Sequence, residues 1–117
     1  MNVEEFRIYC LQKPWVTEEF PFDETTLVFK VAGKMFALTG LDDIEFKVNL
    51  KCNPDRSVQL RETYESIYPG FHMNKLHWNT VRVDGSFSEE LFLELVDHSY
   101  DLVYQGLPKK VRDQLSS

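Results

Sequence analysis

The chain has 117 residues and a mass of 13.8 kDa, and we expect a single domain over residues 1–117. Hydrophobic residues make up 43% and charged residues 27% of the chain, which excludes intrinsic disorder. The presence of only two cysteines excludes a disulfide framework, and no apolar run reaches the ~18–20 residues that a membrane span requires.

The net charge of -6 is unevenly distributed along the chain. Residues 1–24 carry 2 basic and 6 acidic side chains (-4), residues 25–83 carry 8 and 6 (+2), and residues 84–117 carry 3 and 7 (-4). Nucleic-acid-binding domains usually have a clear basic excess, because phosphate neutralisation supplies most of their affinity. A nucleic-acid-binding function would therefore depend on a local basic patch. The acidic start does not resemble a signal peptide, and we expect a cytoplasmic location.

The first predicted element is a helix over residues 2–13, because apolar residues recur on one helical face and Asn2 can cap its start. A loop is predicted over residues 14–24, which are rich in proline and acidic residues. We expect three aromatic side chains to anchor this loop to the body of the protein: Trp15, Phe20 and Phe22.

Three strands are predicted next, over residues 25–31, 35–39 and 44–52. Gly33 tolerates a positive φ and marks a tight turn between the first two. The third shows the cleanest alternation in the chain, because Ile44, Phe46, Val48 and Leu50 point one way and polar residues the other. This pattern indicates a sheet with one face on a core and one face in water.

The second half of the chain predicts two helices and two strands. A helix over residues 54–67 begins with Asn53 as its cap and Pro54 at its first position. Residues 71–83 are predicted as two strands with a bend near Asn74. A long helix from Ser86 or Ser88 to Gly106 follows, and then a short final turn or helix over residues 108–115.

The predicted order is α-β-β-β-α-β-β-α. Short connections favour antiparallel pairing, and helices gathered on one face of such a sheet give a two-layer α+β sandwich. We therefore expect a five-stranded antiparallel sheet whose other face is left open.

One segment is distinctive enough to suggest a family: Pro69-Gly70-Phe71-His72-Met73-Asn74-Lys75-Leu76-His77-Trp78-Asn79-Thr80-Val81. It resembles the Pro-Gly-Tyr-His-Met-Asn-Lys-x-His-Trp-Asn-Thr signature of the MmcQ/YjbR family of small bacterial proteins, from which Phe71 departs by lacking a hydroxyl. The resemblance covers nearly the whole chain. It implies a frataxin-like or secretion-chaperone-like fold, a DNA-binding description, and neither catalytic residues nor a cofactor.

The predicted open face carries the residues that fit nucleic-acid binding. Basic side chains neutralise phosphate, and an aromatic ring stacks on a base. The candidates on the face and at the hairpin tips are Lys30, Lys34, Lys47, Lys51, Lys75, Trp78 and Arg82. Glu45 on the same face weakens this interpretation. Alternating charges are also typical of any half-exposed strand, so a purely structural explanation stays open.

A polar cluster in the signature allows a ligand-binding or a structural interpretation, and its members are His72, Asn74, His77 and Asn79. Two histidines without a nearby cysteine or carboxylate make an incomplete metal site, so we predict no metal. The asparagines are equally suited to pairing with backbone groups at the bend. Nucleophilic and phosphate-loop motifs are missing from the sequence, and Asp42-Asp43 is typical of a turn.

The sequence leaves three functional hypotheses. The first is weak, salt-dependent DNA binding by a protein that is not an enzyme and needs no cofactor. The second is a protein-interaction or chaperone-like module, with a protein partner or a homodimer and no membrane. The third is a small-molecule site around the polar cluster of His72, Asn74, His77 and Asn79.

Overall fold

The computed structural model describes residues 1–70 and 73–116, and in these it contains six strands and four helices. The elements, in chain order, are α1 (Val3–Leu11), β1 (Val16–Glu19), β2 (Thr26–Val31), β3 (Lys34–Gly40), β4 (Lys47–Lys51), α2 (Pro54–Thr63), β5 (Ile67–Pro69), β6 (Trp78–Arg82), α3 (Glu89–Gln105) and α4 (Lys109–Ser116). All strand pairs are antiparallel, in the spatial order β1-β2-β3-β4-β6-β5.

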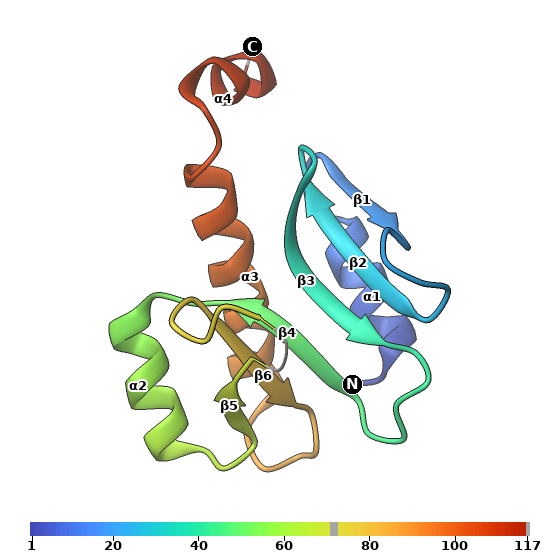
Figure 1. Cartoon of the computed structure of the whole chain (residues 1–117), viewed down its shortest axis with the longest axis vertical. Coiled ribbons are helices and arrows are strands. Elements are labelled where there is room, and N and C mark those ends of the chain that lie inside the picture. The colour runs from blue at the N-terminus through green and yellow to red at the C-terminus, as the bar shows by residue number, and fades with distance from the viewer. Residues whose placement is uncertain (71–72, 117) are drawn as a thin grey trace.

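The helices and the sheet form the two layers that the sequence predicts. Helix α3 packs across β2, β3 and β4, while α1 packs against β1 and α2 against β5. Figure 1 shows α1 and α3 behind the sheet. The interface holds an aromatic cluster in which Phe6 lies 5.4 Å from Phe29, 5.7 Å from Phe46 and 5.7 Å from Phe92 between ring centroids. The α+β prediction is therefore confirmed, with six strands in place of five.

The strand register confirms which residues lie on the sheet face opposite the helices, called the open face below, although Val28, Leu38 and Thr80 at its centre are buried. Val48 and Leu50 are buried against the helices, so the residues that alternate with them point to the other face. On that face Lys47 lies opposite Arg82, Asn49 opposite Thr80, and Lys51 opposite Trp78.

Two strands lie where none was predicted: β5 lies at the predicted end of the helix over residues 54–67, and β1 lies within the segment predicted as a loop. Its acidic residues have low strand propensity, but each finds a basic partner that is distant in the sequence. Glu18 pairs with Arg7 of α1, and Glu19 pairs with Lys30 of β2. Trp15 stacks on Tyr104 as an anchor, with the ring centroids 5.8 Å apart.

The expectation for the other two loop aromatics is wrong, because Phe20 and Phe22 are both exposed. Strand β4 is also shorter than predicted, since the segment before it is a turn and Ile44 is fully exposed.

The predicted boundaries around the signature also need correction. Helix α2 ends at Thr63 and not at residue 67, because Ile67 is buried opposite Val81 as the first residue of β5. Of the segment predicted as two strands, β6 forms the second, and residues 73–77 form a turn. The first of those predicted strands begins at residues 71–72, which lie outside the described residues.

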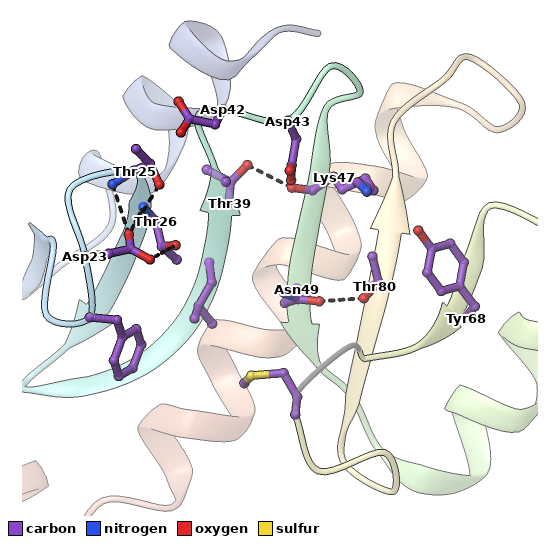
Figure 2. Close-up of a pocket in the computed structure, with 14 residues that line it drawn as sticks. Asp23, Thr25, Thr26, Thr39, Asp42, Asp43, Lys47, Asn49, Tyr68 and Thr80 are labelled. Atoms are coloured by element: carbon purple, nitrogen blue, oxygen red, sulfur yellow. Dashed lines mark hydrogen bonds between the residues drawn. The ribbon is translucent and has the colours of Figure 1, made fainter.

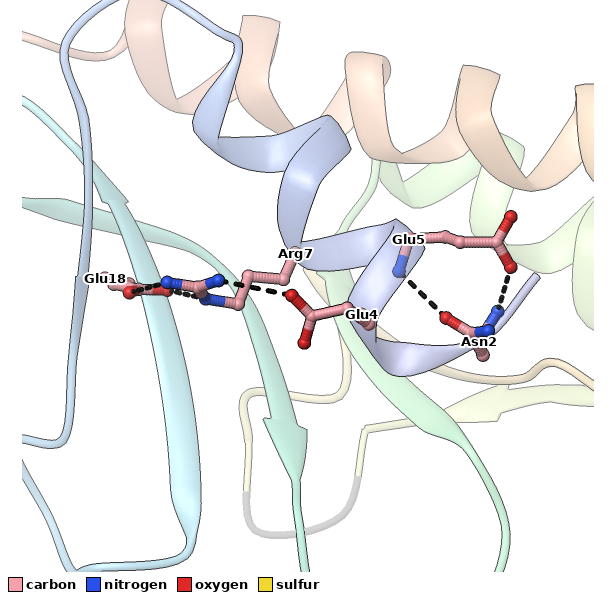
Figure 3. Close-up of polar contacts among 5 residues, drawn as sticks. All are labelled: Asn2, Glu4, Glu5, Arg7 and Glu18. Carbon is pink, nitrogen blue, oxygen red and sulfur yellow. Dashed lines mark hydrogen bonds and ion pairs between the residues drawn. The ribbon is translucent and has the colours of Figure 1, made fainter.

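Two polar contacts fix α1 in place (Figure 3). Asn2 and Glu5 form a reciprocal capping box, with hydrogen bonds of 2.8 and 3.2 Å, so the predicted cap is confirmed. Arg7 donates two hydrogen bonds of 2.6 Å to the Glu18 carboxylate. This two-pronged ion pair, called the Arg7 fork below, joins α1 to the edge strand β1. The hydrogen bonds from Arg7 are the main cause of the lowered pKa of Glu18.

A buried serine joins α3 to two central strands. The β2–β3 ladder has a bulge that places Phe36 between the pairs Phe29–Ala37 and Lys30–Met35, so Phe36 has no opposite residue. Ser99 of α3 is fully buried; it donates a 2.5 Å hydrogen bond to the Phe36 carbonyl and accepts a 2.9 Å bond from the Lys51 backbone amide. One hydroxyl therefore satisfies both backbone groups.

We expect Ser99→Ala to lower the free energy of unfolding by about 1–3 kcal/mol, because it leaves a buried carbonyl and a buried amide without a partner. Urea denaturation measures this loss. Ser116→Ala removes an exposed hydroxyl in α4 and should change the stability by less than about 0.5 kcal/mol. Equal effects of the two substitutions would contradict the role given to Ser99.

We expect Glu18→Gln to reduce the pH dependence of stability in acid. The folded-state pKa of Glu18 is lowered, so its contribution is present above the unfolded pKa and disappears as the pH falls through the folded pKa. The urea midpoint of the wild type should fall more between pH 6 and pH 3 than that of the variant. Parallel acid profiles would show that the Arg7 fork contributes nothing to stability.

Candidate functional site

The antiparallel sheet sorts its charged connections to opposite ends, because successive connections alternate between the ends. At one end the connections span residues 12–15, 32–33, 52–53 and 70–77. Their sequences contain two lysines and no acidic residue. At the other end the connections span residues 20–25, 41–46, 64–66 and 83–88. Their sequences contain no lysine or arginine.

These two regions are the basic end and the acidic end of the sheet. The basic end comprises the residues Lys34, Lys51, Lys75 and Trp78, at strand termini or in the connection of residues 70–77. The acidic end comprises the four connections that hold Asp23, Glu24, Asp42, Asp43, Glu45, Glu65 and Asp84. A separation of this kind is invisible in the linear charge distribution.

The six predicted nucleic-acid-binding cations differ in their surroundings. Lys30 pairs with Glu19 at 3.2 Å, and Arg82 pairs with Asp84 at 3.0 Å. Within the part of the chain that the structure describes, no carboxylate forms an ion pair with the other four, which are Lys34, Lys47, Lys51 and Lys75. Lys47 lies near the acidic end, as Arg82 does, so three unpaired lysines lie at the basic end.

The partner of Arg82 is itself fixed by hydrogen bonds. Hydrogen bonds from Ser86 and Ser66, with a smaller contribution from Arg82, hold the pKa of Asp84 well below its usual range. The Ser66 hydroxyl donates to Asp84 Oδ2 at 2.7 Å. Arg82 therefore faces a carboxylate whose lowered pKa favours the ionised form, and this ion pair reduces the value of Arg82 as a phosphate ligand.

The connection of residues 70–77 presents Lys75 on a loop with many fixed contacts. A Cβ on Gly70 would lie 3.1 Å from the Cβ atoms of Met73 and Trp78, so the loop approaches β6 closely only because residue 70 is glycine. Arg61 of α2 donates to the Lys75 carbonyl at 2.5 Å, and the Lys75 ammonium donates to the Gly70 carbonyl at 3.0 Å. The position of Lys75 is therefore held from both sides.

Two residues of the predicted polar cluster have structural roles. Asn74 Oδ1 accepts hydrogen bonds from the amides of Leu76 and His77, at 2.9 and 3.3 Å, and so stabilises the turn. Asn79 is buried on the core side of β6, where it accepts from Arg61 Nε at 2.7 Å and donates to Ser57 at 3.2 Å. The side chains of these two asparagines are therefore used in hydrogen bonds within the protein.

The histidines of this cluster give no support to a metal site. The His77 backbone carbonyl accepts a 2.8 Å hydrogen bond from Cys52, and its imidazole is half-buried. His72 lies outside the described residues. Among residues 1–70 and 73–116, no three His, Cys, Asp or Glu side chains are grouped as metal ligands would be.

A groove of about 840 Å³ lies across the open face near the acidic end (Figure 2). The residues that line it are Phe22, Asp23, Thr25, Thr26, Leu38, Thr39, Gly40, Asp42, Asp43, Lys47, Asn49, Tyr68, Met73 and Thr80. Figure 2 shows Asn49 and Thr80 in its centre, joined by a 2.6 Å hydrogen bond, with Asp23 and Tyr68 on opposite sides. The groove volume lies within the range of small-ligand sites.

Most of the groove was not predicted from the sequence, which placed a ligand site in the signature. Its acidic residues come from two turns, and turn acids carry no sequence signal of their own. Asp23 accepts backbone hydrogen bonds from Thr25 and Thr26, at 2.9 and 2.6 Å, and these bonds lower its pKa. Of the predicted candidates that the structure describes, only Lys47 lines the groove.

The two thiols are unsuited to nucleophilic chemistry. Cys10 and Cys52 are both buried, and desolvation raises the pKa of Cys10 to about 12 and that of Cys52 in the same direction. In the described part of the chain, no helix combines the length and the apolar character of a membrane-spanning segment.

Comparison with known proteins places this arrangement in a family. The family model described as YjbR matches residues 11–102. The chain is 42% identical over 106 residues to the uncharacterised protein YbdF of Escherichia coli O157:H7, which covers 90% of this chain and 84% of YbdF. It is 32% identical over 115 residues to the uncharacterised protein YjbR of Escherichia coli K12, which covers 98% of each.

Solved structures extend the similarity to the fold. Protein DR2400 of Deinococcus radiodurans, described with the family domain DUF419, matches with a TM-score of 0.92 and 41% identity over 98% of this chain and 88% of that chain. A Pseudomonas syringae protein matches with a TM-score of 0.74 and 28% identity, over 87% of this chain and 98% of that chain. The chain therefore belongs to the YjbR family, as the resemblance at residues 69–81 indicated.

Proposed function

We propose that this protein binds DNA weakly through the basic end of its sheet. One observation supports the proposal: Lys34, Lys51 and Lys75 all lie at one end of the sheet, whose connections contain no acidic residue, and Lys51 there lies opposite Trp78. Because a polyanion is attracted to local positive potential, this end suits phosphate even in a chain of net charge -6.

Two loop tips of the basic end are suited to contact a phosphate backbone. Lys34 follows the tight turn between β2 and β3, where Ala32 and Gly33 have φ values of 47 and 85°. Lys75 lies in the fastened loop between β5 and β6, where its exposed side chain donates to the Gly70 carbonyl. Lys51 and Trp78 lie opposite each other on the strands between these tips. Phosphate contacts of this kind position a protein on DNA without reading its sequence.

The acidic end does not cancel this attraction at physiological salt. The seven residues of β3 span about 23 Å in an extended strand, and the Debye length is about 8 Å at physiological ionic strength. Salt therefore screens the charges at one end from those at the other. When the basic end contacts DNA, the acidic end points away from it. If three lysines neutralise three phosphates, log K should fall with log salt with a slope of about -2.7.

Fluorescence anisotropy with labelled duplex DNA tests the proposal across a range of salt concentrations. We expect Lys34→Glu and Lys75→Glu each to weaken binding by about five- to tenfold, because each replaces attraction of phosphate by repulsion. Lys47→Glu is the matched control: it makes the same charge change on the same sheet but near the acidic end, and should weaken binding by less than about twofold.

Two results would contradict the proposal. The first is that the wild-type protein does not bind duplex DNA at low salt, where electrostatic attraction is least screened. If Lys47→Glu and Lys75→Glu weaken DNA binding equally, the binding depends on the net charge of the protein and not on the basic end.

A further inference from the structure

The acidic end exposes large apolar side chains as well as carboxylates. Phe20 and Phe22 are 49% and 63% exposed in the connection between β1 and β2, and Leu41 and Ile44 are 44% and 103% exposed in the connection between β3 and β4. Acidic residues lie between and beside them, namely Asp23, Glu24, Asp42, Asp43 and Glu45. Apolar residues clustered in this way on a soluble protein mark an interaction surface.

The two connections form one surface, because hydrogen bonds hold them side by side. The Leu41 amide donates to the Thr25 carbonyl at 2.7 Å, directly beyond the strand pair Thr26–Gly40. Within the second connection, the Asp43 carboxylate folds over Gly40, where an added Cβ would lie 2.7 Å from Asp43 Oδ2. These contacts fix the bases of the two connections next to each other.

The groove on the open face continues this surface. Phe22, Asp23, Asp42 and Asp43 belong to the two connections and also line the groove. Against its three carboxylates the groove has one ammonium, that of Lys47, so its lining carries a net charge of -2. The same surface thus combines a concave path, negative charge and exposed apolar residues (Figure 2).

We propose that the connections of residues 20–25 and 41–46, with the adjoining groove, dock a basic segment of a partner protein in which lysine or arginine alternates with large apolar residues. The apolar side chains of such a segment cover Phe22 and Ile44, and its cations meet the carboxylates. Nucleic acid does not suit this surface, because neither connection contains a basic residue. The inference concerns the opposite end of the sheet from the DNA-binding proposal and does not depend on it.

A fluorescein-labelled eight-residue peptide of alternating lysine and leucine is the probe, and anisotropy is the readout. Two further peptides, with glutamate for lysine or serine for leucine, separate the charge requirement from the apolar requirement. We expect binding of the first peptide to be at least about tenfold tighter than that of the other two.

Paired variants locate the binding. We expect Phe22→Ser with Ile44→Ser, and separately Asp42→Asn with Asp43→Asn, to weaken binding of the lysine–leucine peptide by about tenfold or more. The matched controls make the same kinds of substitution, apolar to serine and carboxylate to amide, at exposed positions of the helices. They are Ile8→Ser with Val58→Ser, and Glu62→Gln with Asp113→Asn. These should remain within about twofold of the wild type.

Three results would overturn the inference: no binding of the lysine–leucine peptide, equal weakening by the control variants, or a self-association in gel filtration that Ile44→Ser abolishes. The last would assign the surface to a second copy of the chain. Since Lys34→Glu should leave peptide binding unchanged and Ile44→Ser should leave DNA binding unchanged, failure of either proposal is distinguishable from failure of the other.

Discussion

The antiparallel register of the sheet is the constraint that decides where the charged side chains of this protein lie. Each chain reversal sends the next connection to the opposite end, so residues far apart in sequence meet when their strands are neighbours. Lys34, Lys51 and Lys75 lie at the same end of the sheet in this way, at the start of β3, the end of β4 and in the connection before β6. The net charge of -6 is a sum over the whole chain, so it does not show that the connections at the two ends of the sheet carry charges of opposite sign.

The family signature at residues 69–81 describes mainly how one loop is fastened to the sheet. Gly70 permits the close approach to β6, Asn74 stabilises the turn, and Asn79 is buried in hydrogen bonds to α2. A dense group of polar residues resembles a ligand site in a sequence, but here the asparagine groups are used internally. The fastened loop positions Lys75 at the basic end, and in this way the signature contributes to the proposed DNA-binding surface.

Alternation and caps were sufficient to predict the open face and most element types, because they are local. That Lys47, Lys51, Trp78 and Arg82 share one face follows from a period of two in β4 and β6. Strand β1 depends on the distant partners of Glu18 and Glu19, and the end of α2 depends on the burial of Ile67 against Val81. The two charged ends and the groove depend on the register itself, which a single sequence does not contain.

Exposed apolar residues occur at both ends of the sheet, with Trp15 and Leu76 in connections of the basic end, but four of them gather at the acidic end. Phe20, Phe22, Leu41 and Ile44 all lie at the acidic end, in connections whose carboxylates repel a polyanion. A chain that approaches DNA with its lysines must therefore turn these apolar residues away from the duplex. Under the DNA-binding proposal they stay accessible while the basic end is occupied, and under the docking proposal a basic partner protein is attracted to the acidic end by the charges that keep DNA from it.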